Sequence, residues 1–377
     1  MQVPTRILYG GRSGAAVALV AATAATTLMF VSTPFLIPSI ALRYGVSEGA
    51  AGAISVAQVG SFAAANFILP RAVRPSGKIL WVAALALLAL NTLSIFPEHY
   101  PVLVALRLLA GVAAGTMAWL AWTSAMKRKG SMSSVAATGP VVALVAAPIL
   151  GVASQQGDRA VYLLLALATI PAVLTYTPIS GKRRARGVIS GSRSNRILLT
   201  SLGAMTFFAS ALFINEAIVA RDVHGLTAFA GSLAFSLNAA GGLLGARLST
   251  KHKYPGWFLA SIGPAALLTV VGPPVFFYIG MAWWGFAFWM GVPGVLQMLV
   301  DRSLEPSERA GDGQGLMAVG RAFGPAMGAG FVNAGALNIL AVITATGTTI
   351  SGLTVVGVKE GRDRLPPTDP RTIDQQD

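Results

Sequence analysis

The sequence predicts an all-α membrane protein with twelve transmembrane helices, and two observations lead to this prediction. Apolar stretches of about twenty residues, the length that crosses a hydrocarbon core of about 30 Å, return along the chain. The first runs from Gly14 to Leu42 without a single Lys, Arg, Asp or Glu. Of the 377 residues, 54% are hydrophobic and only 11% are charged, against about 25% charged in a soluble domain. Lipid offers backbone groups no hydrogen-bond partner, so each stretch should be a helix.

The expected helices follow one another with short loops. Their spans are 14–42, 48–70, 78–97, 101–125, 132–155, 160–179, 197–220, 227–249, 255–272, 274–299, 311–333 and 336–357. The first span is longer than the apolar region of a signal peptide, about 7–15 residues, so it should remain as a helix. Gly272, Pro273 and Pro274 predict a tight turn between the ninth and tenth spans. One broken helix at this point would instead give eleven spans and place the C-terminus outside.

The positions of the basic residues favour twelve spans over eleven. With both termini in the cytoplasm, 23 Lys and Arg residues lie inside and three lie outside, the bias that short loops of membrane proteins show. The inside residues are Arg6, Arg12, Arg71, Arg74, Lys78, Lys127, Arg128, Lys129, Lys182, Arg183, Arg184, Arg186, Arg193, Arg196, Arg247, Lys251, Lys253, Arg302, Arg309, Lys359, Arg362, Arg364 and Arg371; the outside ones are Arg43, Arg159 and Arg221. Together with the Ala- and Gly-rich composition and the compact loops, this topology favours a multi-pass protein of a bacterial inner (plasma) membrane.

A basic segment divides the chain into halves. Residues 181–196, which contain Gly, Ser and six arginines or lysines, predict a flexible cytoplasmic linker. The expected domains are an N-terminal six-helix bundle at 1–180 and a C-terminal six-helix bundle at 197–358. The polar tail at 359–377 contains three prolines and is expected to be disordered.

Composition and missing motifs exclude several function classes. The net charge is +14, and most of the basic residues lie in loops between the apolar spans. There they orient the protein in the membrane and contact lipid headgroups, so we expect no nucleic-acid partner. The chain has no Cys, which excludes disulfides and thiolate chemistry. It lacks a G-x-x-x-x-G-K-[ST] phosphate loop and a G-x-S-x-G elbow, and its three histidines lie in separate loops. We therefore expect neither an enzyme nor a bound cofactor or metal.

The fifth and eleventh spans share a pattern of small residues. The eleventh carries Gly311, Gly320, Gly324-Pro325 and Gly328, and the fifth carries Ser134, Ala143, Ala147-Pro148 and Gly151 at the same offsets. Small residues at four-residue spacing let membrane helices approach closely, and a proline limits or kinks a helix. Such packing is common in membrane bundles, but the matching offset favours a duplicated six-helix unit.

With these motifs the chain resembles the major facilitator superfamily over essentially its whole length. Arg107 to Gly111, followed by Gly115, is similar to the Arg-xxx-Gly-xxx-Gly signature of its fourth helix, and Gly157-Asp158-Arg159 is similar to its turn before helix six. The segment Ala147 to Gly151 looks like a degenerate form of the Gly-Pro-xx-Gly-Gly antiporter signature. One loop departs from the family, because Arg74 stands where its charge-relay latch carries an acid. The resemblance implies two helix bundles around a central cavity. The bundles rock against each other, so that the cavity opens alternately inward and outward.

Three ionisable residues stand out inside the spans, where a charge at mid-bilayer costs about 2.5–3.5 kcal/mol and marks a candidate functional site. Arg107 is either a structural arginine that binds helix carbonyls or, as the family implies, a group for proton coupling or substrate charge. Arg321, near the middle of its span, either extends towards the cytoplasmic face or faces the cavity as a counter-charge or anion-binding group. Glu216, next to Asn215, either exchanges a proton close to physiological pH or is a wet residue at the outer rim.

Several uncharged residues are further candidates. The amides of Gln58, Asn238 and Gln297, with Asn333, either tie helices together or bind substrate. The tenth span carries a run of aromatic residues, Trp283, Trp284, Phe286, Phe288 and Trp289. Aromatic residues this close together point in several directions around a helix, so some of them must face lipid. Trp289 is the best candidate for a substrate pocket among them.

The function predicted from these features is secondary active transport. The antiporter-like motifs at Pro148–Gly151 and Gly320–Gly328 favour proton-coupled efflux of a small organic molecule by a monomer. The first alternative is uptake or exchange of a small anion or organic acid, with Arg107 and Arg321 as its ligands. The second is a membrane sensor or scaffold that transports nothing.

Overall fold

The computed structural model describes residues 16–126, 131–179, 192–248, 254–303 and 306–358, and all of their regular structure is helical apart from an isolated bridge at Ser76. The predicted tail at 359–377 and most of the predicted linker lie outside these residues. The helices are α2 (Val17–Tyr44), α3 (Glu48–Ala51), α4 (Ala53–Ala72), α5 (Gly77–Leu93), α6 (Tyr100–Met126), α7 (Ser131–Gln155), α8 (Asp158–Leu174), α9 (Arg193–Phe213), α10 (Glu216–Asp222), α11 (Ala228–Leu248), α12 (Pro255–Leu268), α13 (Pro274–Asp301), α14 (Pro306–Asn333) and α15 (Leu337–Val356).

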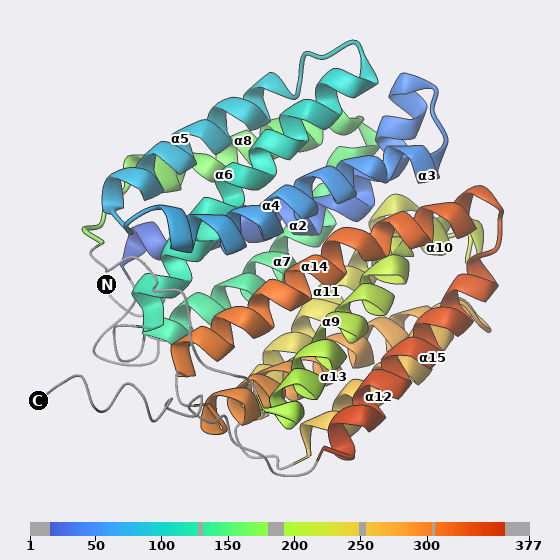
Figure 1. Ribbon diagram of the computed structural model, residues 1–377. Helices are drawn as coiled ribbons and strands as arrows, with labels where there is room; N and C mark the ends of the chain where they lie inside the picture. Colours follow the sequence, from blue (N-terminus) through green and yellow to red (C-terminus); the bar gives the residue numbers. More distant parts are fainter. Residues whose placement is uncertain (1–15, 127–130, 180–191, 249–253, 304–305, 359–377) are drawn as a thin grey trace, which may run out of the picture.

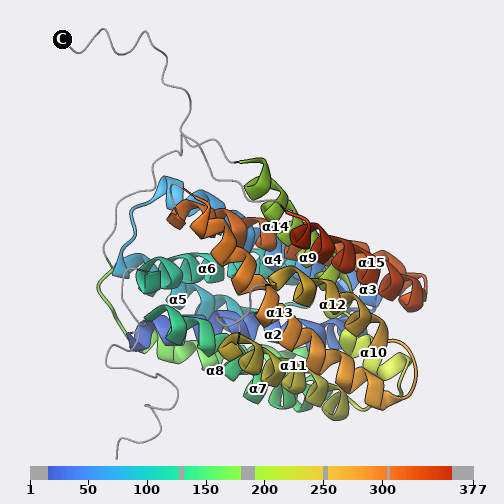
Figure 2. The same cartoon turned by 90° about the horizontal axis from the view of Figure 1, so that it is seen from below.

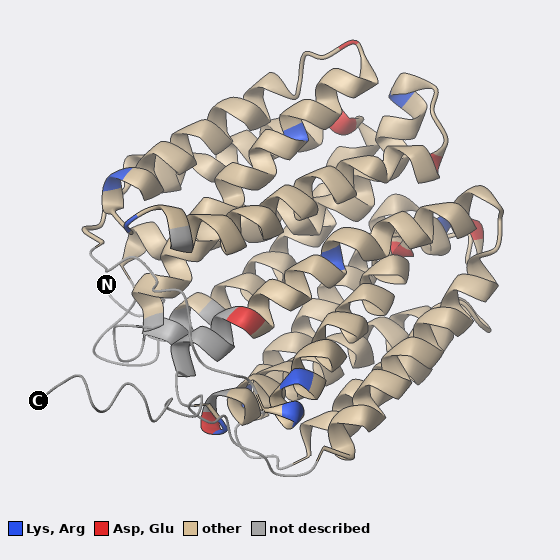
Figure 3. Ribbon diagram, viewed as in Figure 1, with Lys and Arg blue, Asp and Glu red and all other residues tan. Residues whose placement is uncertain are grey.

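These helices form the twelve expected spans. α3 and α4 together make the second span, and α9 and α10 make the seventh, with short interruptions at Gly52 and at Ile214–Asn215. Within the described residues, eight stretches are long and apolar enough to cross a membrane, and α5 and α12 are shorter apolar helices. Figure 3 shows that few charged residues lie along the middle of the helices. The membrane-spanning, all-helical architecture predicted from the sequence is therefore confirmed.

The turn at Gly272 separates two helices, as the even number of spans requires. α12 ends at Leu268, and Gly272 adopts a left-handed conformation with φ +77°, which glycine reaches without steric cost. Pro274 then opens α13, a position where its missing N–H costs nothing. α12 and α13 pack against each other along their length, so the chain reverses at this turn.

The two halves of the chain repeat the same helix pairings. α2 packs on α7 as α9 packs on α14, α4 packs on α6 as α11 packs on α13, and α5 packs on α8 as α12 packs on α15. The halves meet where α4 lies against α14 and where α7 lies against α11. Figures 1 and 2 show the helices running roughly side by side, with the N-terminal helices on one side and the C-terminal helices on the other.

We distinguish two ends of the molecule. The linker end is the one where α8 ends and α9 begins, and the far end is the one where α2 ends and α11 begins (Figure 1). α9 begins at Arg193, inside the segment 181–196 predicted as a linker. Ser192 makes this early start favourable, because its hydroxyl accepts a hydrogen bond of 3.1 Å from the Asn195 N–H.

The small residues of α14 allow it to pack tightly on α9. A Cβ atom placed on Gly320, Gly324 or Gly328 would overlap a carbonyl oxygen of α9, at Gly203, Phe207 and Ala211 respectively. Only glycine permits this approach, which is the role predicted for a four-residue spacing. Gly151 of α7 serves another contact, since a Cβ there would lie 2.5 Å from the Ser232 Cβ of α11 in the other half. Pro148 and Pro325 lie within α7 and α14.

Candidate functional site

The far end is held together by polar contacts between the two halves, which we call the far-end lock. Arg221 of α10 donates to both carboxylate oxygens of Glu48 at the start of α3, at 2.7 and 3.0 Å. The Gly49 N–H donates to the side-chain oxygen of Asn333, the last residue of α14, at 3.1 Å. Asp222 also pairs with Arg221 and holds its guanidinium in place. The lock joins the N-terminal half to α10 and α14 of the C-terminal half.

An aromatic cluster lies beneath the lock. Phe35 of α2 contacts Phe235 of α11 at 5.0 Å between ring centroids, and Phe213 of α9 contacts both Phe235 and Trp284 of α13 at 5.6 Å. Each residue lies seven to ten positions from the far end of its span, which is about 10–15 Å at the helical rise. Phe35, Phe235 and Trp284 are almost completely buried. Four helices from both halves thus meet in one apolar layer that closes the far end.

Arg321 lies on the linker side of this aromatic cluster. Phe288 follows Trp284 by one helical turn on α13, and the guanidinium carbon of Arg321 is 5.7 Å from its ring centroid. The side chain of Arg321 is exposed, and among the described residues no carboxylate pairs with it. The structure therefore places an accessible positive charge against an aromatic ring, midway along the molecule.

Glu216 is fully buried and faces α12. Its Oε1 lies 2.9 Å from the Thr269 hydroxyl, and Oε2 has no hydrogen-bond partner among the described residues. The same hydroxyl lies 2.8 Å from the Ala266 carbonyl. A hydroxyl has one proton, so Thr269 either donates it to Glu216 or donates it to Ala266 and accepts a hydrogen bond from a protonated Glu216 carboxyl. The wet-rim alternative for Glu216 does not fit this burial.

Asn215 connects Glu216 to the small-residue motif of α14. Its amide donates to the Ala211 carbonyl at 2.8 Å, and the residue is buried. A Cβ on Gly328 would lie 2.7 Å from its side-chain nitrogen. The structure thus brings Asn215 against α14, whereas among the described residues no hydrogen bond or ion pair joins Glu216 to Arg321.

Arg107 has the geometry of a structural arginine. It is fully buried and donates to the Asn91 side-chain oxygen at 3.0 Å and to the Leu90 carbonyl at 3.1 Å, both on α5. Its guanidinium carbon lies 4.9 Å from the ring centroid of Tyr162 on α8. Arg107 therefore ties α6 to α5 and α8 within the N-terminal half and does not join Arg321.

Two of the amide candidates connect helices. Gln58 donates to the Met29 carbonyl at 3.4 Å and Asn238 to the Met281 carbonyl at 2.9 Å, each on a neighbouring helix. Gln297 donates to Asp301 on its own helix at 2.6 Å. Trp289 packs against α11, since a Cβ on Gly242 would lie 2.7 Å from its indole ring.

The far-end lock was not foreseen from the sequence. A signal was nevertheless present, because the predicted outside loops contain three arginines and the acids Asp158 and Asp222, and Glu48 opens the second predicted span beside one of these loops. Two of these arginines find acids across a long sequence distance, Arg221 with Glu48 and Arg43 with Asp158 at 2.7 Å. The aromatic cluster had no comparable signal, since its four residues come from four spans.

Comparisons with known proteins agree with this architecture. A profile of the Major Facilitator Superfamily matches residues 17–329. Similar solved structures include a POT family transporter in complex with a thioalcohol-conjugated peptide, with a TM-score of 0.70, 11% identity and coverage of 90% of this chain and 94% of that chain. Another is a D-xylose-proton symporter, with a TM-score of 0.68, 13% identity and coverage of 91% of this chain and 97% of that chain. A third is a bacterial homolog of the human lysosomal transporter Spinster, with a TM-score of 0.61, 14% identity and coverage of 90% of this chain and 94% of that chain. No curated protein sequence matches. Since the profile covers most of the chain and the helices pack in two matching sets of six, the chain belongs to the major facilitator superfamily, a family of secondary membrane transporters.

Proposed function

We propose that the protein carries a small organic anion across the membrane by alternating access, with Arg321 binding the charge of the substrate. The observation that supports this proposal is the exposed side chain of Arg321, whose guanidinium carbon lies 5.7 Å from the Phe288 ring centroid and which pairs with no carboxylate among the described residues. At an effective dielectric constant of about 20, a negative unit charge 4 Å from the guanidinium is attracted by about 4 kcal/mol. The same charge would repel a cation.

The contacts at the far end define what would have to separate during transport. Opening that end requires breaking the far-end lock and parting Phe35 from Phe235, the ring pair that crosses between the halves. Arg221 is 47% exposed, so its ion pair with Glu48 contributes only about 0.2–1 kcal/mol. Such a lock favours the closed far end without trapping the protein there.

We also propose that the linker end faces the cytoplasm of a bacterial cell and that the protein works as a monomer. The orientation is supported by the topology predicted from the sequence, which assigns 23 basic residues to the inside loops and three to the outside loops. In this orientation Arg321 lies on the cytoplasmic side of the aromatic cluster, where a substrate destined for efflux would bind.

Flux into proteoliposomes tests the anion proposal. Purified protein would be screened against pools of labelled organic acids, sugars and cationic dyes, with Arg321→Gln, Arg321→Lys and the control Arg247→Gln, an exposed arginine at the end of α11. We expect saturable anion flux that falls at least about a hundredfold in Arg321→Gln, falls less in Arg321→Lys, and is unchanged in the control. Export of cationic dyes with no anion flux would refute the proposal, as would unchanged anion flux in Arg321→Gln.

A second candidate feature is proton coupling through Glu216. Its support is the buried carboxyl beside Thr269, together with Asn215, which connects it to Gly328 in the antiporter-like motif of α14. A change of charge at Glu216 would therefore act where α9 and α14 pack most closely. This arrangement suits a proton-driven exporter.

Replacement of Glu216 by Gln tests the coupling separately. We expect Glu216→Gln to abolish accumulation driven by a pH gradient while substrate exchange continues, because the amide keeps the shape of the carboxyl but exchanges no proton. Glu98→Gln, at an exposed position of the far end, is the matched control. Gradient-driven accumulation that survives in Glu216→Gln would rule this residue out as the coupling group.

A further inference from the structure

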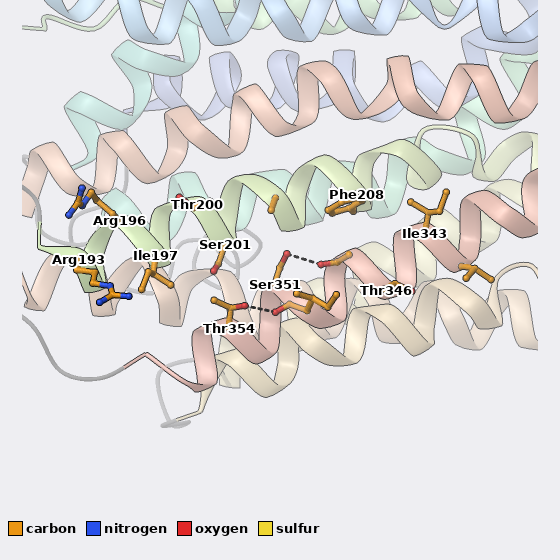
Figure 4. A pocket seen from close by; sticks show the side chains of 14 residues that line it. Arg193, Arg196, Ile197, Thr200, Ser201, Phe208, Ile343, Thr346, Ser351 and Thr354 are labelled. Carbon is orange, nitrogen blue, oxygen red and sulfur yellow. Dashed lines mark hydrogen bonds between the residues drawn. The ribbon is translucent and has the colours of Figure 1, made fainter.

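A lateral groove runs between α9 and α15, away from the site around Arg321. Its volume is about 960 Å³, and the α9 residues that line it run from Arg193 to Phe208. On α15 the lining runs from Val342 to Thr354, and Figure 4 shows these side chains on the facing sides of the two helices. At 1.5 Å per residue the groove is about 18–22 Å long, slightly more than one leaflet of a hydrocarbon core of about 30 Å.

The body of the groove is mostly apolar, with scattered hydroxyl groups, and is closed towards the far end. Val342 and Ile350 are 55% and 59% exposed, and apolar side chains exposed on a membrane-spanning helix face lipid. The Thr344 hydroxyl donates to the Phe208 carbonyl at 3.1 Å and joins the two helices where the groove ends. Ser351 and Thr354 donate to carbonyls of their own helix at 2.7 and 2.8 Å, so their protons are already used. An apolar chain therefore fits this part.

The linker end of the groove carries positive charge. Arg193 and Arg196 lie there in Figure 4, beyond Ile197 and Thr200, and both side chains are exposed. Both belong to the first turn of α9, where the helix dipole disfavours cations. Neither forms an ion pair with a described residue. An anionic group bound here would neutralise the two arginines and would itself be favoured by the positive end of the helix dipole.

We infer that this groove binds one anionic phospholipid from the leaflet at the linker end, with its phosphate at Arg193 and Arg196 and an acyl chain between α9 and α15. Basic pockets between helices on this side of a membrane suit anionic headgroups, and the length of the groove suits a chain lying within one leaflet. The lipid would bridge the first and last helices of the C-terminal half. This binding does not depend on which substrate the protein transports.

Native mass spectrometry of delipidated full-length protein tests the inference. Phosphatidylglycerol and phosphatidylcholine with identical acyl chains would be titrated onto the wild type, Arg193→Gln/Arg196→Gln, and the control Arg247→Gln at the same end. We expect one phosphatidylglycerol to bind more tightly than phosphatidylcholine, with a loss of about thirtyfold in the double variant and no loss in the control. Equal affinity for the two lipids, or unchanged phosphatidylglycerol binding in the double variant, would overturn the inference.

A groove-filling variant separates a lipid from a free phosphate. Thr346 lines the groove and is exposed, so Thr346→Trp fills the acyl-chain path and leaves both arginines in place. We expect it to weaken phosphatidylglycerol binding, and we expect glycerol phosphate not to displace the lipid. Undiminished lipid binding in Thr346→Trp together with displacement by glycerol phosphate would contradict a lipid groove and assign the arginines to a soluble phosphate.

Discussion

At the scale of single residues, the charged groups inside the spans have different surroundings, and these suggest different roles. Arg107 donates two hydrogen bonds to α5 within the N-terminal half, whereas Arg321 remains accessible against Phe288. The sequence identifies both as exceptional, because a charge in a span is costly wherever it points. It does not reveal which face of the helix meets which neighbour, since that depends on packing between helices distant in sequence. The choice between a structural and a functional arginine therefore required the fold.

Replacement of Arg107 tests its structural role. Arg107→Ala leaves the buried side-chain oxygen of Asn91 without its donor, so we expect the protein to lose about 2 kcal/mol of stability. Arg247→Ala, at an exposed position, should change stability by less than about 0.5 kcal/mol. Thermal unfolding in detergent measures both, with transport assayed below the transition. An unchanged unfolding temperature combined with lost transport would show that Arg107 acts in function instead.

At the scale of helices, most of the fold was predictable because lipid sets the length and composition of each span. The turn at Gly272 and the start of α13 at Pro274 had clear local signals. The interruption between α9 and α10 at Ile214–Asn215 had only a weak one, since no Gly or Pro stands there and only Asn215 and Glu216 suit a helix start. The break leaves Asn215 at the contact with α14 and Glu216 facing Thr269. Tertiary contacts, rather than local propensity, account for it.

The glycine contact between α14 and α9 gives a prediction with an internal control. A Cβ on Gly324 would overlap the Phe207 carbonyl, while a Cβ on Gly330 of the same helix meets nothing within 4 Å. We expect Gly324→Ala to cost about 1–3 kcal/mol through overpacking and Gly330→Ala to be neutral. Thermal unfolding of both variants in the same detergent measures the difference. Equal stability of the two variants would mean that α14 and α9 do not touch as closely as the structure shows.

At the scale of the whole molecule, the two halves share one set of helix pairings and meet at the far end in an asymmetric lock. The repeated pairings were indicated by the matching offset between the fifth and eleventh spans. The lock was not, because Glu48 and Arg221 are 173 positions apart and each looks like an ordinary loop residue. The sequence places both residues at the predicted outside ends of spans, but which residue pairs with which follows from the assembled fold.

Breaking the lock should shift the balance between closed and open far ends. Glu48→Gln removes the ion pair between the halves, and a loss of up to about 1 kcal/mol raises the population of the open form by up to about fivefold. Asp222→Asn also removes a carboxylate from Arg221 but only within the C-terminal half, so it is the matched control. Distances between spin labels on cysteines introduced at Ala50 and Val223 report the populations. The lock assignment fails if the two variants give the same distance distribution.

The side from which position 321 can be reached tests alternating access most directly. The natural chain has no Cys, so Arg321→Cys provides a single reactive thiol. With the protein in oriented membranes, a membrane-impermeant thiol reagent should modify it from the linker side only, because the lock and the aromatic cluster close the far end. In the Glu48→Gln background, modification from the far side should appear as well. Modification from the far side with the lock intact, or from neither side in either background, would contradict this account of the protein as an alternating-access transporter with its substrate site at Arg321.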